Sequence, residues 1–232
     1  MSLIIALHLG EGIVMASDSR TTYNNSTTAP DGTITHNNGV HFSDSTYKTF
    51  LTPTGVGIST CGQASINNKP IAGYIECFIN EHRTANVDEI KDAIIPYFKS
   101  LCPTIDTHFL IGGYITSGTT YEQKLYQILT SIDRIESIDT SVQGAIWDGE
   151  IDILSRIITT VYTKSGKAIT NHPIPFNHFT IQDAIDFSKF AIQTTIDTMR
   201  FQQRGKTVGG AIDILIIKPD NSFWIAQKEL HK

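Results

Sequence analysis

The sequence has little charge and no concentration of basic residues. Lys, Arg, Asp and Glu together make up 18% of its 232 residues, and the formal net charge at pH 7 is -5. Affinity for nucleic acid depends largely on clustered Lys and Arg side chains that neutralise phosphates. Because the sequence contains no such cluster, we expect no nucleic-acid partner.

Cysteine is scarce, and neither cysteine nor histidine shows a metal-binding spacing. The chain has three cysteines, Cys61, Cys77 and Cys102, and eight histidines that form neither a His-Glu-x-x-His nor a His-x-His motif. We therefore expect no metal and no other cofactor. An odd number of unpatterned cysteines is typical of buried, reduced thiols, and a catalytic cysteine is the alternative.

Long apolar runs are also missing. No stretch approaches the roughly 20 apolar residues that a membrane-spanning helix needs. The apolar start of the chain is interrupted at His8 and Gly10, and it lacks the basic residues and cleavage site of a signal peptide. These features predict a cytoplasmic protein with no membrane partner.

Short apolar runs and turn residues divide the chain into expected strands and helices. Turns rich in Gly, Pro and Asn join strands into hairpins, and capping-box spacing at Asn86 and at Thr180 marks two helix starts. The expected strands are 3–9, 13–16, 47–51, 56–61, 108–115, 124–129, 141–147, 211–217 and 222–226. The expected helices run from Gly62 to about His82, from Asn86 to about Cys102, over 150–162 and from Thr180 to beyond Met199.

The order of these elements predicts an α+β fold. Blocks of hairpins alternate with pairs of helices, which favours two antiparallel sheets packed face to face, with helices on both outer surfaces. We expect this four-layer αββα sandwich to form one domain over residues 1–232. The polar segment 21–45 is expected to be a long loop or a mobile hairpin that covers or lines a functional site.

Ser2 is the first candidate for chemistry. Removal of Met1 would give Ser2 a free α-amine, whose usual pKa of about 7.7 to 8.0 suits a general base at neutral pH. One residue would then supply both the nucleophile and its base. The alternative is that Ser2 is a strand-edge serine without a catalytic role.

Lys48 and Asp18 are the candidate partners of Ser2. A lysine near the amine would favour its unprotonated form, and an aspartate would balance and orient that lysine. The alternative is a purely structural ion pair, because such pairs also perturb pKa values.

The first twenty residues resemble the start of proteasome β-type subunits, which are N-terminal nucleophile hydrolases. Ser2 matches the nucleophile, Asp18 the neighbouring acidic residue, and Arg20 and Thr22 match positions near the substrate channel. Lys48, followed by Thr49 and Phe50, matches the active-site lysine that opens a later strand of that family. The resemblance therefore implies an N-terminal nucleophile hydrolase fold in a divergent, bacterial-type homologue.

The resemblance extends along most of the chain. The segment ISTCGQA matches the turn that carries the oxyanion-hole amide, which we place between Ser59 and Gly62. Residues 209–213, GGAID, match a signature that opens a late strand. The sequence departs from the family at Gly144, where a Ser-Gly-Ser segment is usual, and at Gly205, where an aspartate is usual.

Two functions follow from the resemblance. The first is hydrolysis of an amide or peptide bond by Ser2, and the second is the role of a catalytically inactive scaffold subunit with the same fold. The resemblance also implies a homo-oligomer, as a ring or a related stack. An ATPase partner is implied by analogy alone.

Overall fold

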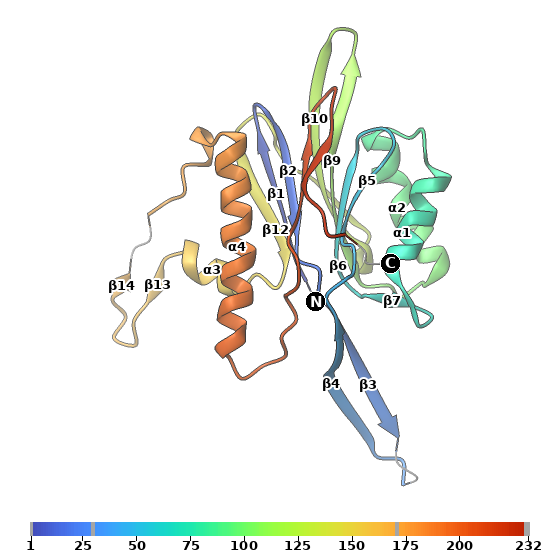
Figure 1. Ribbon diagram of the computed structural model, residues 1–232, viewed down its shortest axis with the longest axis vertical. Coiled ribbons are helices and arrows are strands. Elements are labelled where there is room, and N and C mark those ends of the chain that lie inside the picture. Colours follow the sequence, from blue (N-terminus) through green and yellow to red (C-terminus); the bar gives the residue numbers. More distant parts are fainter. Residues whose placement is uncertain (1, 29–30, 170–171, 230–232) are drawn as a thin grey trace.

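The computed structural model describes residues 2–28, 31–169 and 172–229, and they form the expected four layers (Figure 1). One sheet is covered on its outer face by α3 (Asp152–Ile158) and α4 (Ile181–Phe201). The other sheet is covered by α1 (Ile71–Glu81) and α2 (Val87–Leu101). The predicted α+β, αββα architecture is confirmed.

Both main sheets are five-stranded and antiparallel. The first has the order β12-β1-β2-β15-β16, with strands Gly144–Gly149, Leu3–Leu9, Gly12–Ser17, Asp213–Ile217 and Phe223–Ala226. The second has the order β11-β10-β9-β6-β5, with strands Arg134–Ser137, Thr120–Leu129, Thr107–Ser117, Gly57–Gly62 and Thr49–Leu51.

The described residues also form three two-stranded hairpins and two 3-10 turns. The hairpin of β3 (Thr21–Thr28) and β4 (Ile34–Ser43) extends away from the sandwich (Figure 1), so the hairpin expectation for the polar segment is confirmed. The remaining elements are β7 (Ser65–Ile66), β8 (Lys69–Pro70), β13 (Val161–Tyr162), β14 (Ala168–Ile169), η1 (Thr130–Ile132) and η2 (Phe176–His178).

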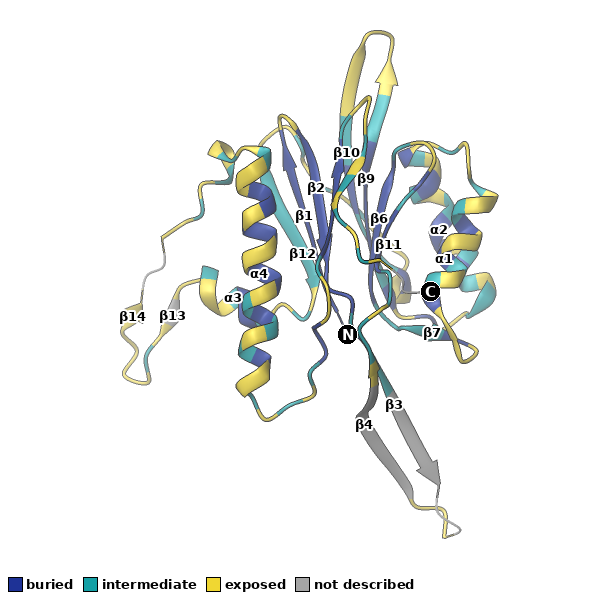
Figure 2. Ribbon diagram, in the orientation of Figure 1, coloured by how far each residue is buried: buried dark blue, intermediate teal, exposed yellow. Residues whose placement is uncertain are grey.

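The apolar core is divided among the three spaces between the layers. One cluster lies between the first sheet and α3–α4, a second between the second sheet and α1–α2, and a third between the two sheets. Strands β1 and β2 are buried throughout, β9 and β10 are exposed where they join each other, and the helices bury one side only (Figure 2). A strand covered on both faces can be apolar at nearly every position, which explains why His8 is the only polar residue in the LIIALHL segment of β1.

Both predicted capping boxes are present. Asn86 accepts hydrogen bonds from the backbone N–H groups of the first turn of α2, and Glu89 bonds back to the Asn86 N–H. Thr180 and Asp183 form the same arrangement at the start of α4. Each box satisfies N–H groups that a helix start leaves unpaired.

Two helix predictions were too long. The segment after Gly62 first forms the β7–β8 hairpin, because Asn67 and Asn68 adopt positive φ angles, and α1 begins only after Pro70. The helix expected over 150–162 is limited to α3, since the β-branched residues that follow Ile158 favour extended backbone.

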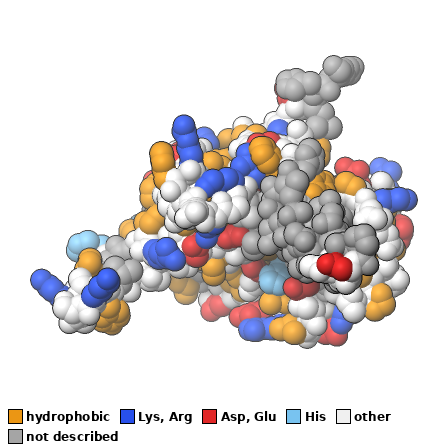
Figure 3. Space-filling view, turned by 90° about the horizontal axis from the view of Figure 1, so that it is seen from below, with side chains coloured by type: hydrophobic (Ala, Val, Ile, Leu, Met, Phe, Trp, Pro, Cys, Tyr) orange, Lys and Arg blue, Asp and Glu red, His pale blue; other side chains and the backbone are white. Residues whose placement is uncertain are grey.

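The outer surface mixes charges of both signs. Lys and Arg side chains are interspersed with acidic and uncharged ones on the coloured part of the face in Figure 3. Among the described residues, no helix combines the length and the apolar character that crossing a membrane requires.

Candidate active site

The centre of the candidate site is the buried carboxylate of Asp18, just beyond the end of β2. Asp18 is fully buried. Its Oδ1 accepts hydrogen bonds from the Leu3 N–H at 3.1 Å and from Lys48 Nζ at 2.7 Å. Its Oδ2 accepts from the N–H groups of Arg20 at 3.1 Å and Gly209 at 2.9 Å. One carboxylate thus forms hydrogen bonds with the start of the chain, the segment after β2 and the segment before β15.

Lys48 lies immediately before β5 and is 3% exposed. Its ammonium group donates to Asp18 and, at 2.5 Å, to the carbonyl oxygen of Arg20. Burial lowers the pKa of Lys48 below its usual value, although the carboxylate of Asp18 acts in the opposite direction. The structure therefore brings together Asp18 and Lys48, the two residues that the sequence suggested as an ion pair.

Ser2 lies beside this ion pair at the beginning of β1 and is 6% exposed. Its carbonyl oxygen accepts a hydrogen bond of 2.7 Å from the Glu150 N–H. Ser2 and Lys48 line the same narrow pocket, together with Thr60, Gly62 and other residues of the β6 end. Ser2 precedes β1 of one sheet and Lys48 precedes β5 of the other, so residues next to both sheets border this pocket.

The end of β6 supplies polar groups to this pocket. The Thr60 N–H donates to the Lys48 carbonyl at 2.8 Å. Since N–H groups alternate in direction along a strand, the Gly62 N–H points to the same side as that of Thr60. The strand on that side, β5, begins opposite Ser59 and does not reach Gly62. Gly62 has a φ of 96°, and a Cβ there would lie 2.7 Å from the Asp106 carbonyl oxygen. A residue with a side chain would therefore be strained at this position.

Ser59 is farther from the pocket than expected. Its side chain is fully buried within the second sheet, where its hydroxyl lies 2.9 Å from that of Thr49. Ser59 does not line the pocket, whereas Gly62 does. Thr60 lines the pocket and Thr22 follows the lining residue Thr21. Both hydroxyls are buried without a hydrogen-bond partner among the described residues.

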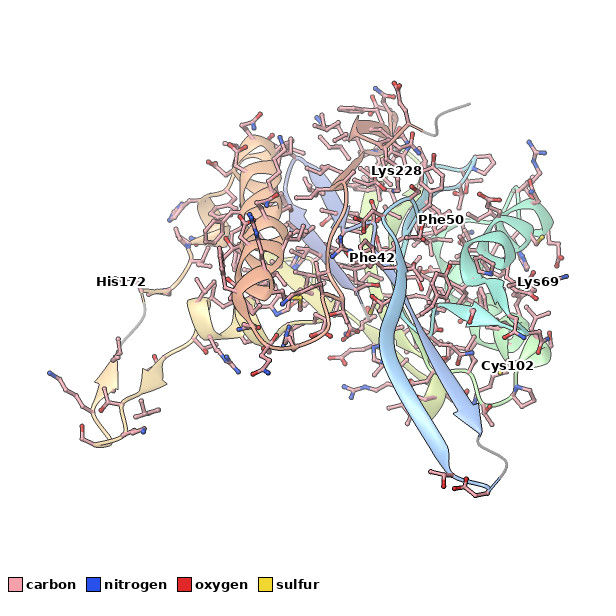
Figure 4. All side chains as sticks on the ribbon, turned by 60° about the horizontal axis from the view of Figure 1, so that its bottom comes forward. Phe42, Phe50, Lys69, Cys102, His172 and Lys228 are labelled. Carbon is pink, nitrogen blue, oxygen red and sulfur yellow. The ribbon has the colours of Figure 1, made fainter. Side chains whose placement is uncertain are left out.

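Arg20 is held by a second ion pair. Its guanidinium forms two hydrogen bonds with Asp44, of 2.6 and 2.7 Å, and stacks 4.3 Å from the ring centre of Phe42. Figure 4 shows Phe42 on the β3–β4 hairpin. A Cβ on Gly209 would lie 2.5 Å from the guanidinium carbon, so this position has room for glycine only while Arg20 stays in place. Arg20 thereby fixes the base of the hairpin next to the pocket.

The turn at Gly149 and Glu150, which no sequence motif indicates, contacts Ser2. Gly149 has a φ of 97°, and a Cβ there would lie 1.8 Å from the Ser2 carbonyl oxygen. Glu150 then donates its N–H to that oxygen. Gly144, which was aligned with this part of the family pattern, pairs instead with His8 at the other end of β12. A single glycine fixes no register, so the sequence could not place Gly144 relative to Ser2.

Cys61 is a poor candidate for the nucleophile. It is 4% exposed, and burial raises the pKa of its thiol well above the usual value, with the nearby carboxylate of Asp148 adding to the effect. The thiolate is the reactive form of cysteine. The environment of Cys61 therefore disfavours the form that an attack would need.

Comparisons with known proteins identify solved structures that share this fold. No protein-family model and no curated protein matches the sequence. Among solved structures, Anbu from Hyphomicrobium sp. strain MC1 is 16% identical over 98% of this chain and 88% of its own, with a TM-score of 0.60. Its Gly-1 mutant is 18% identical over 97% and 87%, with a TM-score of 0.58. Anbu from Yersinia bercovieri, titled an ancestral beta-subunit, is 14% identical over 97% and 87%, with a TM-score of 0.55.

These findings correct the family assignment made from the sequence. The assignment to a proteasome β-subunit-like hydrolase family was wrong, because no family model matches and the structural neighbours are Anbu chains at low identity. Identities of this size show the fold and no more. The chain has the fold seen in these Anbu structures.

Proposed function

We propose that this protein hydrolyses amide bonds with Ser2 as its N-terminal nucleophile, after removal of Met1. The observation that supports the proposal most strongly is the buried Asp18–Lys48 pair, whose lysine lines the same pocket as Ser2. Buried ionisable groups are costly to maintain and are concentrated at functional sites.

The chemistry divides among four groups. The Ser2 hydroxyl attacks the substrate carbonyl carbon, and its proton passes to the α-amine of Ser2. That amine then protonates the departing nitrogen, which leaves an ester on Ser2 that a water molecule cleaves. The ammonium group of Lys48 disfavours a second positive charge on the amine, and Asp18 holds this lysine in place.

Gly62 is the group that we assign to the oxyanion hole. Its N–H is on the β5 side of β6, beyond the end of β5, and Gly62 lines the same pocket as Ser2. A backbone N–H directed at a developing negative charge stabilises the transition state. Ser59 has no such access, so the assignment made from the sequence narrows to Gly62.

The substrate side of the pocket is formed by the base of the β3–β4 hairpin. We assign Thr22 and Thr60 as hydrogen-bonding groups for a peptide substrate, because both hydroxyls are buried and lack a partner among the described residues. Arg20 supports this side indirectly through Asp44 and Phe42.

We also propose that one domain carries the whole site and that the chain forms a homo-oligomer. Light scattering after size-exclusion chromatography would test the oligomeric state.

The proposal is tested by covalent labelling. An electrophile that reacts with N-terminal nucleophiles, such as a peptide epoxyketone, should add once to the native protein, and fragment mass spectra should place it on Ser2. We expect Ser2→Ala and Lys48→Ala to abolish labelling while the far-UV spectrum is unchanged. The control Lys164→Ala changes an exposed lysine and should label normally.

Two results would count against hydrolysis. Retention of Met1 in protein made in its own host would leave Ser2 without a free amine and would favour the scaffold role. Equal labelling of wild type and Ser2→Ala would show that another nucleophile reacts.

A further inference from the structure

Three potential metal ligands meet between the two sheets, next to the pocket of Ser2. They are the Cys61 thiol on β6, the His108 imidazole on β9 and the Asp148 carboxylate on β12. One ligand atom from each lies within 4.8 Å of the other two. The three residues are far apart in the sequence, so no short motif indicates their proximity.

Regular structure fixes the positions of these residues. Cys61 and His108 are directly opposite each other in the β6–β9 pairing, so their side chains project from the same face of the second sheet. Asp148 approaches that face from β12, the edge strand of the first sheet. Ligands placed on paired strands are held more precisely than ligands on loops.

The geometry is close to that of a tetrahedral zinc site. Zinc binds sulfur at about 2.3 Å and nitrogen or oxygen at about 2.0 to 2.2 Å, which corresponds to roughly 3.3 to 3.6 Å between ligand atoms. His108 Nδ1 and Asp148 Oδ2 are 3.0 Å apart. The three ligand atoms lie within 4.8 Å of one another, so side-chain movements of up to about 1.5 Å would bring them to these separations.

Neighbouring polar groups orient the ligands. Asp106 Oδ1 lies 3.7 Å from His108 Nε2, the ring nitrogen that faces away from Asp148. The Gln127 side-chain amide donates to Asp148 Oδ2 at 2.8 Å, and the Gly149 N–H donates to Oδ1 at 2.6 Å. A carboxylate behind a ligating histidine and hydrogen bonds to a ligating carboxylate are usual around zinc.

We propose that Cys61, His108 and Asp148 bind one Zn2+ ion. The mixed sulfur, nitrogen and oxygen set suits a borderline-soft cation rather than Mg2+ or Ca2+, which prefer oxygen ligands alone. A coordinating thiol loses its proton to the metal, so burial of Cys61 is no obstacle. The side chains of His108 and Asp148 are 26% and 15% exposed, which leaves a path to solvent and a fourth position for water. The site does not depend on Ser2 acting as a nucleophile.

The proposal is tested by metal titration of the full-length protein after dialysis against a chelator. We expect one Zn2+ per chain in competition with a chromophoric chelator. Cys61→Ser, His108→Gln and Asp148→Asn should each lower the affinity by at least about 100-fold, and Asp106→Asn by about 10-fold. The matched control Cys102→Ser changes a thiol at the end of α2 and should bind as the wild type does.

Cobalt provides a direct signature of the thiolate. Co2+ added to the wild type should give a near-ultraviolet sulfur-to-cobalt charge-transfer band, which should be lost in Cys61→Ser and kept in Cys102→Ser. Because the band is measured on the wild type, it tests for a thiolate ligand even where a variant fails to fold. Absence of the band, or binding that Cys102→Ser removes, would overturn the proposal.

Discussion

Replacing Asp18 with asparagine perturbs the candidate site with the least change in shape. The carboxylate offers one oxygen to Leu3 and Lys48, and the other to Arg20 and Gly209. Asparagine has one carbonyl oxygen, so its NH2 group must face two of these donors. The substitution also removes the only carboxylate that pairs with the Lys48 ammonium among the described residues.

The expected loss of stability is large. Removing one partner of a buried ion pair costs about 3–5 kcal/mol, because the other charge stays buried without compensation. Since domains are stable by only about 5–15 kcal/mol, Asp18→Asn should lose a substantial part of the free energy of unfolding. Lys48→Met should lose less, because Asp18 would keep its three backbone N–H donors, whereas Lys48 alone keeps only the Arg20 carbonyl.

Equilibrium unfolding in urea measures these differences. Asp220→Asn, at an exposed turn, is the matched control and should stay within about 0.5 kcal/mol of wild type. The double variant Asp18→Asn/Lys48→Met should lose at least about 1 kcal/mol less than the sum of the single variants. A loss below about 1 kcal/mol for Asp18→Asn, or additive losses in the double variant, would refute this account of the pair.

Three further predictions concern other parts of the structure. Gly149→Ala should displace Ser2 and abolish its labelling, because the added Cβ would lie 1.8 Å from the Ser2 carbonyl oxygen; normal labelling would contradict this. The hydrogen bond from Arg20 lowers the pKa of Asp44 below its usual 3.8, so the stability that Asp44 contributes is present at neutral pH and is lost as the pH falls through its folded-state pKa. The stability difference between wild type and Asp44→Asn, about 0–1 kcal/mol at pH 7, should therefore shrink in urea titrations below about pH 4, and a constant difference would argue against the pair. Thr180→Ala should cost about 1 kcal/mol in the same assay through loss of the α4 cap, and an unchanged midpoint would mean that the cap is not needed.

Local signals in the sequence predicted the fold well. The β1–β2 hairpin is defined by two apolar runs around Gly10 and Gly12, and the capping boxes mark the starts of α2 and α4. The short helix α3 and the β7–β8 hairpin were harder to predict, because turn residues such as Asn67 compete with helical periodicity over only a few positions.

The site could be predicted only where family-like spacing identified a residue. Lys48 pairs with Asp18 and lines the same pocket as Ser2. The contact of Gly149 with Ser2 depends on the register between β1 and β12, which residue spacing cannot fix. The Cys61–His108 pairing depends in the same way on the register of β6 and β9.

The most direct test of the central claim compares one protein before and after its N-terminus is freed. A cleavable leader that ends immediately before Ser2 keeps the side chain and blocks the α-amine, and its removal restores only that amine. The account predicts no epoxyketone adduct and no amide hydrolysis before cleavage, and one adduct on Ser2 with hydrolysis after it. Equal labelling before and after cleavage, or none after it in folded protein, would contradict the claim that Ser2 is an N-terminal nucleophile.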